Sequence, residues 1–462
     1  MIEIIEKNIY SRLSQNVPEL NALLSAYVPG YYFMKSYKIG HFDGKVHFYN
    51  PIYKTFPTGL MNDVLKYFEE KGIEYSIVDQ RKKSDLVNQE SIDIDKLELE
   101  GIQLRDYQKE SLNAILKKGR GVIKAATNSG KTEIGIALCK ILSPLNCLWL
   151  THTKELLFQT ADRFKERTGE SVALTYGGEV DFSKRIIIAL IQTLSKRLNV
   201  SYVKDFLKKK IDILIIDEVH HSDSMSFHNI AMKTDAFYRI GLSATPFAKG
   251  KLPSMKIRSI TGDEVLEIAN EFMIDKGYSA PPIIIFETIN CPQDIGNLNY
   301  QDAYEKGIVF NEERNNRILE KFAENRKKRA LILVQRLDHG DILSEKIKIP
   351  FVHGEVDQDK RREIYKKFKK GALRHLIAST IYDEGVDYAG IEVLILAGGG
   401  KSEVRSIQRI GRGMRKMQGK NNVIVYDFID NTNMYLLKHS LERLRTYSKE
   451  GFMVKRGTDR ND

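Results

Sequence analysis

The chain has 462 residues, a length that allows about three domains of ordinary size. Hydrophobic residues make up 42% and charged residues 29% of it, so general disorder and a fibrous repeat are excluded. Three cysteines without a CxxC pair exclude a disulfide scaffold, a zinc ribbon and a four-cysteine iron–sulfur site. The N-terminus lacks a signal-peptide pattern, and no apolar run approaches the roughly 18 residues of a membrane span. We therefore expect a soluble cytoplasmic protein with no membrane partner.

The net charge of +11 is concentrated in the C-terminal third. Residues 360–374 carry eight basic side chains against one acidic, and residues 401–420 carry seven against one. The rest of the chain is left at −2. This distribution is typical of a surface that binds a polyanion. For residues 360–370 alone, the solvated face of an amphipathic helix is the alternative explanation.

Residues 1–97 are predicted to form a small α+β accessory domain that recognises nucleic acid. KVHFYNPIY alternates like a strand, and GLMNDVLKYFEEKG has the period of an amphipathic helix that ends at Gly72. Ten aromatic residues between Tyr27 and Phe56 are interleaved with four lysines. Such a mixture binds nucleic acid by stacking and phosphate contact, but it also builds ordinary sheet cores. The sequence leaves both possibilities open.

Residues 98–278 and 279–432 each alternate short apolar strands with helices. The first segment contains GVIKAA, NCLWLTH, RIIIALIQT, IDILIIDE and YRIGLSAT, and the second contains RALILVQ, HLIAST, VLILAG and NVIVYDF. Continuous apolar strands predict a parallel sheet covered on both faces, so we expect an α/β fold with two successive lobes. GYSAPP, residues 277–282, is the predicted hinge, and residues 433–462 are predicted to form a basic helical tail.

The segment AATNSGKT, residues 125–132, has the features of a phosphate-binding loop between a strand and a helix. Backbone N–H groups and the helix N-terminus would hold the phosphates. Lys131 would reach the β- and γ-phosphate oxygens and Thr132 would bind Mg²⁺, while Ala125 stands where the usual pattern has glycine. The residues predicted to bind the nucleotide here are Thr127, Asn128, Ser129, Gly130, Lys131 and Thr132.

Two acidic residues, Asp217 and Glu218, follow a hydrophobic strand of the first lobe. At the end of such a strand, Asp217 would orient the hydrated Mg²⁺ and Glu218 would polarise the attacking water as a general base. The neighbouring histidines, His220 and His221, have no third metal ligand at suitable spacing in the sequence, so a zinc site is not expected. Ser243 and Thr245 end a further strand, and their order and spacing relative to the phosphate loop make them part of the same pattern.

The second lobe carries QRIGRGMR at residues 408–415. Arg412 and Arg415 are three residues apart, so on one helical turn their side chains would project the same way. They could neutralise charge on a γ-phosphate, as arginine fingers do. ASTIYDEGVD, residues 378–387, places hydroxyls and a glycine after a strand. GGGKS, residues 398–402, mimics a second phosphate loop, but a glycine-rich turn is expected because the following helix leads into the arginine motif.

The ordered set of motifs resembles that of superfamily-two helicases of the DExH type. The set is LRDYQ, AATNSGKT, LTHTKELLFQT, GG at 177–178, IQT, DEVH, SAT, LILVQ, FVHGE, IASTIYDEGVD and QRIGRGMR, and it covers about residues 98–430. The resemblance implies two tandem RecA-like parallel-sheet lobes. It also implies an enzyme that uses ATP and Mg²⁺ and hydrolyses ATP in response to nucleic acid.

The same resemblance implies roles for individual residues. Gln108 would recognise adenine, with Arg105 nearby. Contacts to a nucleic-acid strand would come from Thr153, Lys154, Gly178, Thr193, Gln335, Arg336, His353 and Thr380. Gly385 and Asp387 would lie at the ATP end of their motif, and Gln408 would act as a sensor beside the two arginine fingers. Coupling of the ATP site to the strand would involve His220, Ser243 and Thr245.

Residues 37–79 indicate which kind of superfamily-two helicase this is, because they resemble the accessory domain of UvsW-type phage recombination helicases. This likeness implies ATP-driven remodelling of branched or forked DNA: Holliday-junction branch migration, fork regression and duplex unwinding in recombination, repair or replication. We accordingly expect DNA as partner, recombination or replication proteins as possible associates, a monomer, and the host-cell cytoplasm for a phage-encoded chain. An RNA helicase and a nucleotide-latched nucleic-acid-binding module stay open as alternatives.

Overall fold

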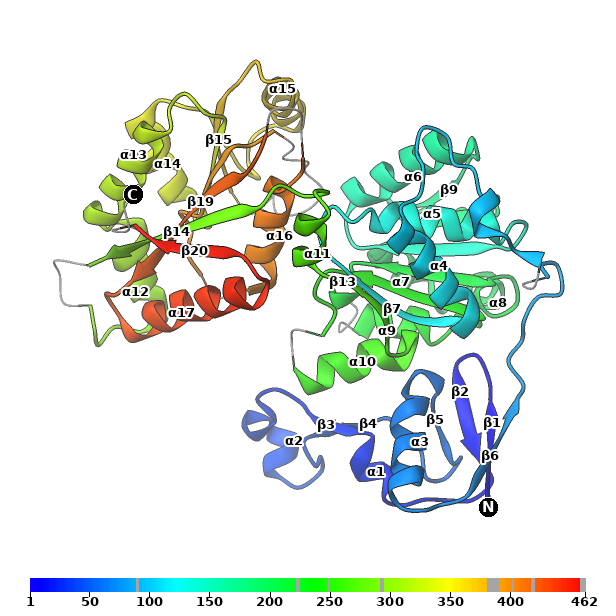
Figure 1. The fold of residues 1–462 in the computed structure, drawn as a ribbon. Helices are drawn as coiled ribbons and strands as arrows, with labels where there is room; N and C mark the ends of the chain where they lie inside the picture. Colours follow the sequence, from blue (N-terminus) through cyan, green and yellow to red (C-terminus); the bar gives the residue numbers. More distant parts are fainter. Residues whose placement is uncertain are drawn as a thin grey trace. The chain divides into compact units, whose positions relative to one another are not determined.

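The structure is a computed structural model that describes residues 1–88, 91–221, 225–247, 250–290, 295–379, 390–400, 403–416 and 420–457 (Figure 1). It divides into two compact units, Met1–Ala125 with Gly130–Ile268, and Ala126–Ser129 with Ala269–Asp462. The first unit holds an N-terminal module, residues 1–79, and one α/β lobe, and the second holds another α/β lobe. The division after Ile268 falls ten residues before the boundary placed at 278 from the sequence.

The N-terminal module is built on a four-stranded sheet in the order β5-β2-β1-β6. Its strands are β1 (Ile2–Glu6), β2 (Tyr10–Leu13), β5 (Thr55–Pro57) and β6 (Tyr75–Asp79). Helix α3 (Met61–Glu70) buries Met61, Val64 and Phe68, which is the amphipathic pattern predicted for this segment. A second small sheet pairs β3 (Ser25–Tyr27) with β4 (Lys45–His47). The short helices are α1 (Leu20–Leu23), η1 (Tyr31–Phe33), α2 (Lys35–Lys38) and η2 (Thr58–Leu60).

The first lobe is a seven-stranded parallel sheet in the order β13-β7-β12-β11-β8-β10-β9. Its strands are β7 (Arg120–Ala125), β8 (Cys147–Thr151), β9 (Ala173–Thr175), β10 (Ile186–Leu190), β11 (Ile213–Asp217), β12 (Tyr238–Ser243) and β13 (Glu264–Ile268). All five strands predicted from apolar runs are present. The run at 185–193 ends early, because residues from Ile191 onward begin a helix.

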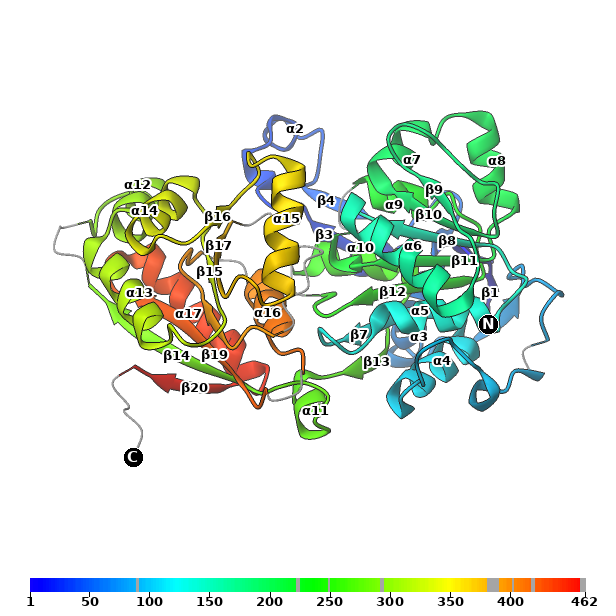
Figure 2. The same cartoon turned by 90° about the horizontal axis from the view of Figure 1, so that it is seen from above.

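Helices cover both faces of this sheet, as the apolar strands require (Figures 1 and 2). They are α4 (Asp106–Lys118), α5 (Lys131–Ile141), α6 (Lys154–Thr168), α7 (Ile191–Arg197), α8 (Ser201–Lys209), α9 (Met225–Ala231) and α10 (Lys251–Thr261). On one face, α7 to α10 pack their apolar residues on the strands. On the other face, α5 passes so close to β8 that a Cβ at Gly135 would overlap the ring of the fully buried Trp149.

The second lobe is also a seven-stranded parallel sheet, in the order β16-β17-β15-β18-β19-β14-β20. Its strands are β14 (Pro282–Ile289), β15 (Ala330–Leu333), β16 (Phe351–Val352), β17 (His375–Ala378), β18 (Val393–Ile395), β19 (Val423–Asp430) and β20 (Met453–Arg456). Its helices are α11 (Asn270–Asp275), α12 (Tyr300–Tyr304), η6 (Glu305–Val309), α13 (Glu312–Glu324), α14 (Leu337–Ile347), α15 (Gln358–Lys369), α16 (Glu403–Gly413) and α17 (Met434–Lys449). The two parallel sheets make the chain a tandem of RecA-like lobes preceded by a small sheet domain.

The C-terminal segment that the sequence sets apart as a basic helical tail is part of the second lobe. Helix α17 packs on β19, and β20 pairs with β14 at the edge of the sheet. Arg443 of α17 is 2% exposed and forms an ion pair with Asp427, which is 0% exposed. Most of the positive charge of α17 therefore lies on the outer side of a helix whose inner side completes the lobe.

The N-terminal module packs on the first lobe through α10. Leu252 and Met255 of α10 belong to the module's hydrophobic core. Arg258 donates to Asp63 of α3 at 2.8 Å and also pairs with Asp263 of the lobe.

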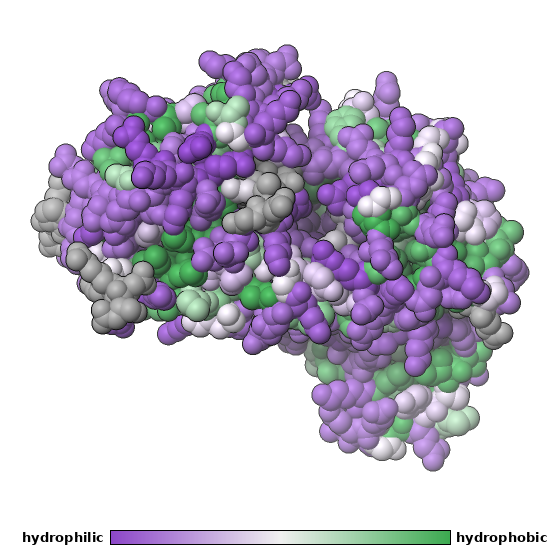
Figure 3. All heavy atoms as spheres, turned by 45° about the horizontal axis from the view of Figure 1, so that its top comes forward, coloured by the Kyte–Doolittle hydropathy of each residue, from purple (hydrophilic) through white to green (hydrophobic). Residues whose placement is uncertain are grey.

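Among the described residues, no helix is long and apolar enough to cross a membrane. The face drawn in Figure 3 is mostly hydrophilic.

Candidate active site and nucleic-acid interface

The predicted ATP-site residues of the first lobe lie at the carboxyl ends of three adjacent strands. β7 is followed by the phosphate-binding loop, β12 ends at Ser243 and β11 ends at Asp217. Because these strands are parallel neighbours in the order β7-β12-β11, their following residues share one edge of the sheet. In open α/β sheets, ligands bind outside the carboxyl ends of the strands.

The phosphate-binding loop leads directly into α5, whose first residue is Lys131. Asn128 and Gly130 have φ of 73° and 79°, a left-handed backbone that turns the chain sharply before the helix begins. The Lys131 ammonium donates to the carbonyl of Ala125 at 3.3 Å and lies 3.9 Å from the Glu218 carboxylate. Lys131 therefore lies where the loop meets the helix N-terminus, and helix N-termini are places where anions can bind.

Gln108 lies directly over this loop. Its side chain is buried at 5% exposure, and its Oε1 accepts the N–H of Arg105 at 2.9 Å in a capping box at the start of α4. A Cβ at Gly130 would overlap Gln108 Nε2, so the Gln108 side chain packs closely against the end of the loop. The structure therefore brings together two motifs that are more than twenty residues apart in the chain.

Asp217 and Glu218 form a partly buried carboxylate pair next to Lys131. Burial of Asp217 raises its pKa to about 6, and repulsion from Glu218 adds to the shift. Asp217 Oδ1 accepts the N–H of Glu218 at 3.0 Å. Glu218 has a φ of 48°, which is uncommon for a residue with a side chain, and residues with such strained backbones cluster at active sites and ligand clamps.

A polar chain links the ends of β11 and β12. His220 Nδ1 lies 3.3 Å from Glu218 Oε2 and 2.9 Å from Ser243 Oγ. Ser243 Oγ in turn accepts the N–H of Thr245 at 3.1 Å. The residues predicted to couple the ATP site to the strand are thus connected to one another and to the predicted general base.

Four predicted strand-contacting residues of the first lobe follow β8, β9 and β10, toward the other side of the same sheet edge. Thr153 caps α6 by accepting the N–H of Leu156 at 3.3 Å, and Lys154 is exposed beside it. Gly178 is exposed with a φ of 95°, and its carbonyl accepts from Arg197. Thr193 is only 6% exposed within α7. Three of the four therefore lie at the surface, and Thr193 does not.

In the second lobe, the predicted strand-contacting residues follow β15 and β16. Gln335 and Arg336 are exposed at the start of α14, where Arg336 pairs with Asp338 at 3.3 Å. His353 is partly buried directly after β16. Thr380, Gly385 and Asp387 lie outside the described residues.

The arginine motif begins on α16, but the prediction that both arginines lie on one helical turn is wrong. The helix ends at Gly413, and Arg415 forms an isolated β-bridge with Ser279. The cause is local: glycines are poor helix formers, and the carbonyl of Met414 accepts the N–H of Ala280 at 2.8 Å. The motif's Gln408 lies in α16, and its side chain is outside what the structure describes.

Of the glycine-rich segment after β18, the structure describes residues 398–400, and these belong to a turn whose carbonyls are used inside the lobe. Its carbonyls accept hydrogen bonds from inside the lobe: Arg443 Nη1 donates to Gly400 at 2.7 Å, Tyr304 to Gly398, and Arg314 to Ala397. A phosphate loop would instead use N–H groups to bind an anion.

Comparison with known proteins identifies two domains. Residues 101–248 match the family "Type III restriction enzyme, res subunit", and residues 313–417 match "Helicase conserved C-terminal domain". Together these matches cover more than half of the chain.

Curated relatives agree with these domains. The chain is 27% identical to the putative DNA 3'-5' helicase Rad25 of Haloarcula marismortui over 70% of this chain, which is about half (52%) of that protein's length. It is 27% identical to the DNA 3'-5' translocase XPB2 of Sulfurisphaera tokodaii over 77% of this chain and 86% of the relative. It is 23% identical to the ATP-dependent DNA helicase uvsW of Enterobacteria phage T4 over 94% of both chains. The crystal structure of T4 UvsW aligns with a TM-score of 0.50 at 21% identity over 98% of both chains.

The fold and the matched domains define the class of protein. Two RecA-like lobes with a phosphate loop and an acidic pair at the end of a neighbouring strand make an ATP-dependent enzyme. The chain belongs to the superfamily-two helicases and resembles UvsW.

Proposed function

We propose that the protein is an ATP-driven DNA helicase or translocase that remodels branched DNA, by branch migration, fork regression or unwinding. The observation that carries this proposal is the match to the T4 relative over 94% of both chains, because it includes the N-terminal module as well as the two lobes. The relatives named as DNA helicases or translocases support DNA as the substrate. The host-cell cytoplasm and association with recombination or replication proteins belong to the same proposal.

The ATP site supports hydrolysis by the residues already placed at the edge of the first sheet. Lys131 and the N–H groups before α5 would bind the phosphates, and Gln108 with Arg105 would bind the adenine. Glu218 would take the proton of the attacking water, with His220 at 3.3 Å holding its carboxylate in place. Arg412 and Arg415 would neutralise charge on the γ-phosphate when the lobes close, and Gln408 would sense it.

The residues near Asp217 suit a magnesium ion. A buried carboxyl whose pKa is raised to about 6 is a group that a cation would stabilise in its charged form. Carboxylate and hydroxyl oxygens, here Asp217 and Thr132, are ligands that Mg²⁺ prefers. When bound, the ion would neutralise charge on the phosphate oxygens.

The bound nucleic-acid strand would run across the surface residues of both lobes. Thr153, Lys154 and Gly178 in the first lobe, and Gln335, Arg336, His353 and Thr380 in the second, are the proposed contacts. Thr193 would support this surface from below, since it is buried. Phosphate contacts of this kind make binding salt-sensitive and nearly independent of sequence. Gly385 and Asp387 are proposed to connect the second lobe's contacts to ATP.

The N-terminal module supports a role in DNA recognition because part of its aromatic set is exposed. Phe48 and Phe56 are core residues, but Tyr27, Tyr32 and Phe33 are 53%, 55% and 73% exposed. Tyr27 stacks on Tyr31 with ring centroids 4.6 Å apart, and the Lys45 ammonium lies 4.8 Å from the Tyr27 centroid. Exposed rings next to lysines are suited to stacking bases beside bound phosphates.

The test compares ATP turnover and strand displacement on four-way junctions, forks, linear duplex DNA and duplex RNA. We expect the largest stimulation by junctions or forks. Stimulation by RNA alone would favour the RNA-helicase alternative. This alternative is included because one relative is named "Putative ATP-dependent RNA helicase L396". Nucleic-acid binding without any ATP turnover would favour the nucleotide-latched module.

A variant pair tests the ATP site itself. Lys131→Ala should fold normally and lose ATP hydrolysis, because the positive charge that is proposed to bind the β- and γ-phosphates would be missing. Lys140→Ala, at the exposed end of the same helix, is the matched control and should hydrolyse ATP at the wild-type rate. Normal turnover by Lys131→Ala would refute the phosphate-loop assignment.

A further inference from the structure

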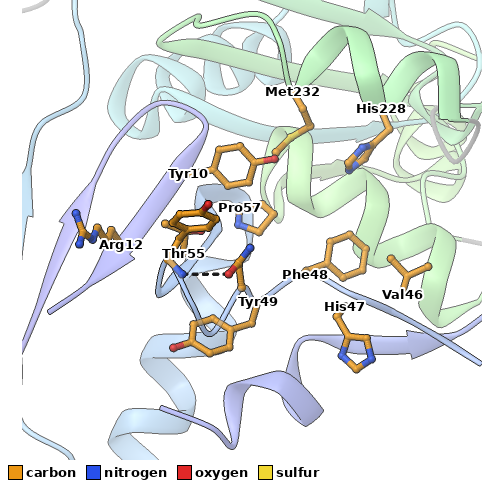
Figure 4. Close-up of a pocket in the computed structure, with 12 residues that line it drawn as sticks. Tyr10, Arg12, Val46, His47, Phe48, Tyr49, Thr55, Pro57, His228 and Met232 are labelled. Carbon is orange, nitrogen blue, oxygen red and sulfur yellow. Dashed lines mark hydrogen bonds between the residues drawn. The ribbon is translucent and has the colours of Figure 1, made fainter. Parts of the chain in front are cut away.

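A pocket of about 660 Å³ lies between the N-terminal module and the first lobe, within one compact unit (Figure 4). A cavity of this volume is in the range that holds a small ligand or a nucleotide. Sequence reasoning did not find it, because its residues come from three separate segments of the module and from α9 of the lobe.

One wall of the pocket is the outer face of the β2–β5 pair. In this antiparallel ladder Tyr10 lies opposite Pro57 and Arg12 opposite Thr55. Side chains alternate between the two faces of a strand, so Ser11 and Leu13 enter the module core while Tyr10 and Arg12 face outward. The wall therefore combines a phenol ring, a proline ring and a guanidinium group.

The turn that connects β4 to β5 extends this wall. Asn50 pairs with Thr55 through two backbone hydrogen bonds of 2.8 and 3.1 Å. Asn50 Oδ1 accepts the N–H groups of Ile52 and Tyr53, which leaves the NH₂ end of the amide to serve other acceptors. Tyr53 lines the pocket although 68% of its surface is exposed. An aromatic ring that lines a pocket without being buried is available to stack on a ligand.

The opposite wall comes from His228 of α9 and from Met232, the residue that directly follows this helix (Figure 4). His228 Nε2 lies 3.1 Å from Ser259 Oγ. Burial, with Lys256 and Arg239 nearby, lowers the pKa of His228 to about 4, so the ring is neutral at physiological pH. The two walls are fixed relative to each other because the Asn8 side chain bonds to the carbonyl of Asp235, and Arg258 bonds to Asp63.

The charge around the pocket is suited to a polyanion with a neutral ring. The residues that line the pocket include no carboxylate, and Arg12 is a lining cation. Asp43 lies outside the lining and pairs with the lining His47 at 2.7 Å. A phosphodiester backbone would be attracted to Arg12, while the interior offers aromatic faces and an amide donor.

We propose that this pocket accepts a single unstacked nucleobase of a DNA strand, with Tyr10 and Tyr53 stacking on the base and Arg12 holding an adjacent phosphate. The inference rests on the proposed DNA function and extends it. A base held between the module and α9 would anchor unpaired DNA next to the first lobe, as a branched substrate requires. A phenol ring can stack on any base, so the pocket would bind unpaired bases without preference for their sequence.

The test measures binding of the full chain to two single-stranded oligonucleotides of equal length, one carrying bases and one with abasic sites throughout. Tyr10→Ala and Tyr53→Ala should weaken binding of the base-bearing strand by roughly fivefold to a hundredfold. They should leave binding of the abasic strand unchanged, because the phosphates remain. Arg12→Ala should weaken binding of both strands equally.

Two further variants make the result specific to the pocket. Ile52→Ala removes a side chain that is 82% exposed in the same turn but does not line the pocket, and it should bind both strands like wild type. Met232→Trp fills the pocket from the lobe side and should reproduce the loss seen for Tyr53→Ala. Unchanged preference for bases in the tyrosine variants and in Met232→Trp would overturn the proposal, as would an equal loss on both strands in the tyrosine variants. Failure of the wild-type chain to respond to any DNA would instead overturn the proposed function.

Discussion

Arg443 and Asp427 form an ion pair inside the second lobe, with side chains 2% and 0% exposed. The guanidinium also donates to the carbonyls of Gly400 and Phe428, and Asp427 also accepts from Tyr447. Four of the five N–H donors of Arg443 are thus used, and such additional hydrogen bonds are the condition under which a buried pair is tolerated. Through Gly400, the pair positions the turn that precedes α16 and its arginine motif.

Arg443→Met should therefore destabilise the second lobe by about 3–5 kcal/mol, because it leaves the buried Asp427 charge uncompensated. Adding Asp427→Asn should recover part of the loss. Arg445→Met, on the exposed side of the same helix, should change stability little. Urea unfolding followed by far-UV circular dichroism measures all three, and equal stability of Arg443→Met and Arg445→Met would contradict the role of the pair.

His228 makes the first unit sensitive to acid. Its folded-state pKa of about 4 is below the ordinary value of 6.5, so the unfolded chain binds the proton more readily between these values. Stability contributed by the neutral ring is complete above pH 6.5 and is lost as the pH falls toward 4. His228→Gln keeps an amide near Ser259 but does not titrate. Wild type should lose about 2–3 kcal/mol more than this variant between pH 7 and pH 4, measured by urea unfolding at each pH; parallel curves would contradict the assignment.

At this scale, the sequence predicted the residues at the ATP site but not how they meet. Gln108, Lys131 and Asp217 could be named because short motifs carry them. The close packing of Gln108 on Gly130 and the left-handed backbone of Glu218 depend on tertiary packing, which no local pattern encodes. The burial of Thr193 could not be predicted either, since the apolar run predicts that IQT ends a strand, whereas residues 191–193 begin α7.

Helix α10 is the element that joins the N-terminal module to the first lobe. Its apolar side enters the module core, and its backbone approaches η2 so closely that a Cβ at Gly59 would overlap the carbonyl oxygen of Arg258. Gly59 has no need of an unusual backbone angle. Its lack of a side chain is required only by this contact between the two domains.

Gly59→Val should therefore separate the module from the lobe while leaving each folded. We expect faster proteolytic cleavage in the linker at residues 80–97 and weaker binding to branched DNA, with basal ATP hydrolysis unchanged. Lys66→Ala on the exposed side of α3 is the control and should behave like wild type. Resistance of Gly59→Val to cleavage equal to that of the control would show that the contact is dispensable.

The elements most visible in the sequence were the buried strands. All nine predicted apolar runs form strands, since continuous burial on both faces gives a strong local signal. Five strands of the two lobes were not predicted, and four of them have a physical reason; the fifth, β14, is an apolar run that the predicted set did not include. β13 is half exposed, β9 has only three residues, and β16 has two. β20 lies in a segment whose basic character indicated a solvent-exposed tail, although strand pairing at the edge of the sheet buries part of it.

For the molecule as a whole, the sequence predicted an excess of positive charge in the C-terminal third. Helix α15 carries much of it. Ile364 and Phe368 pack on the core of the lobe, while Lys366, Lys369 and Lys370 are exposed. The structure thus agrees with the amphipathic explanation of this segment, and the exposed lysines remain available to bind phosphates.

Replacing Lys366, Lys369 and Lys370 by alanine should lower the salt dependence of DNA binding. If each lysine neutralises one phosphate, the slope of log K against log salt should fall by about two to three. The triple replacement of Lys208, Lys209 and Lys210, three exposed lysines around the end of α8, is the matched control. Fluorescence anisotropy at four salt concentrations measures both. An equal change in the two triple variants would show that α15 acts only through the overall charge.

The single tryptophan of the chain gives one lobe a natural optical label. Trp149 lies in the centre of the first sheet, fully buried, with its ring 5.7 Å from that of Phe164 and in contact with Gly135 of the helix that follows the phosphate loop. Tryptophan emission therefore reports on unfolding of the first lobe alone. Unfolding of the second lobe, which contains no tryptophan, should leave this emission unchanged. Heating curves recorded by emission and by heat capacity on one sample would show whether the two halves of this motor lose their structure together or one after the other.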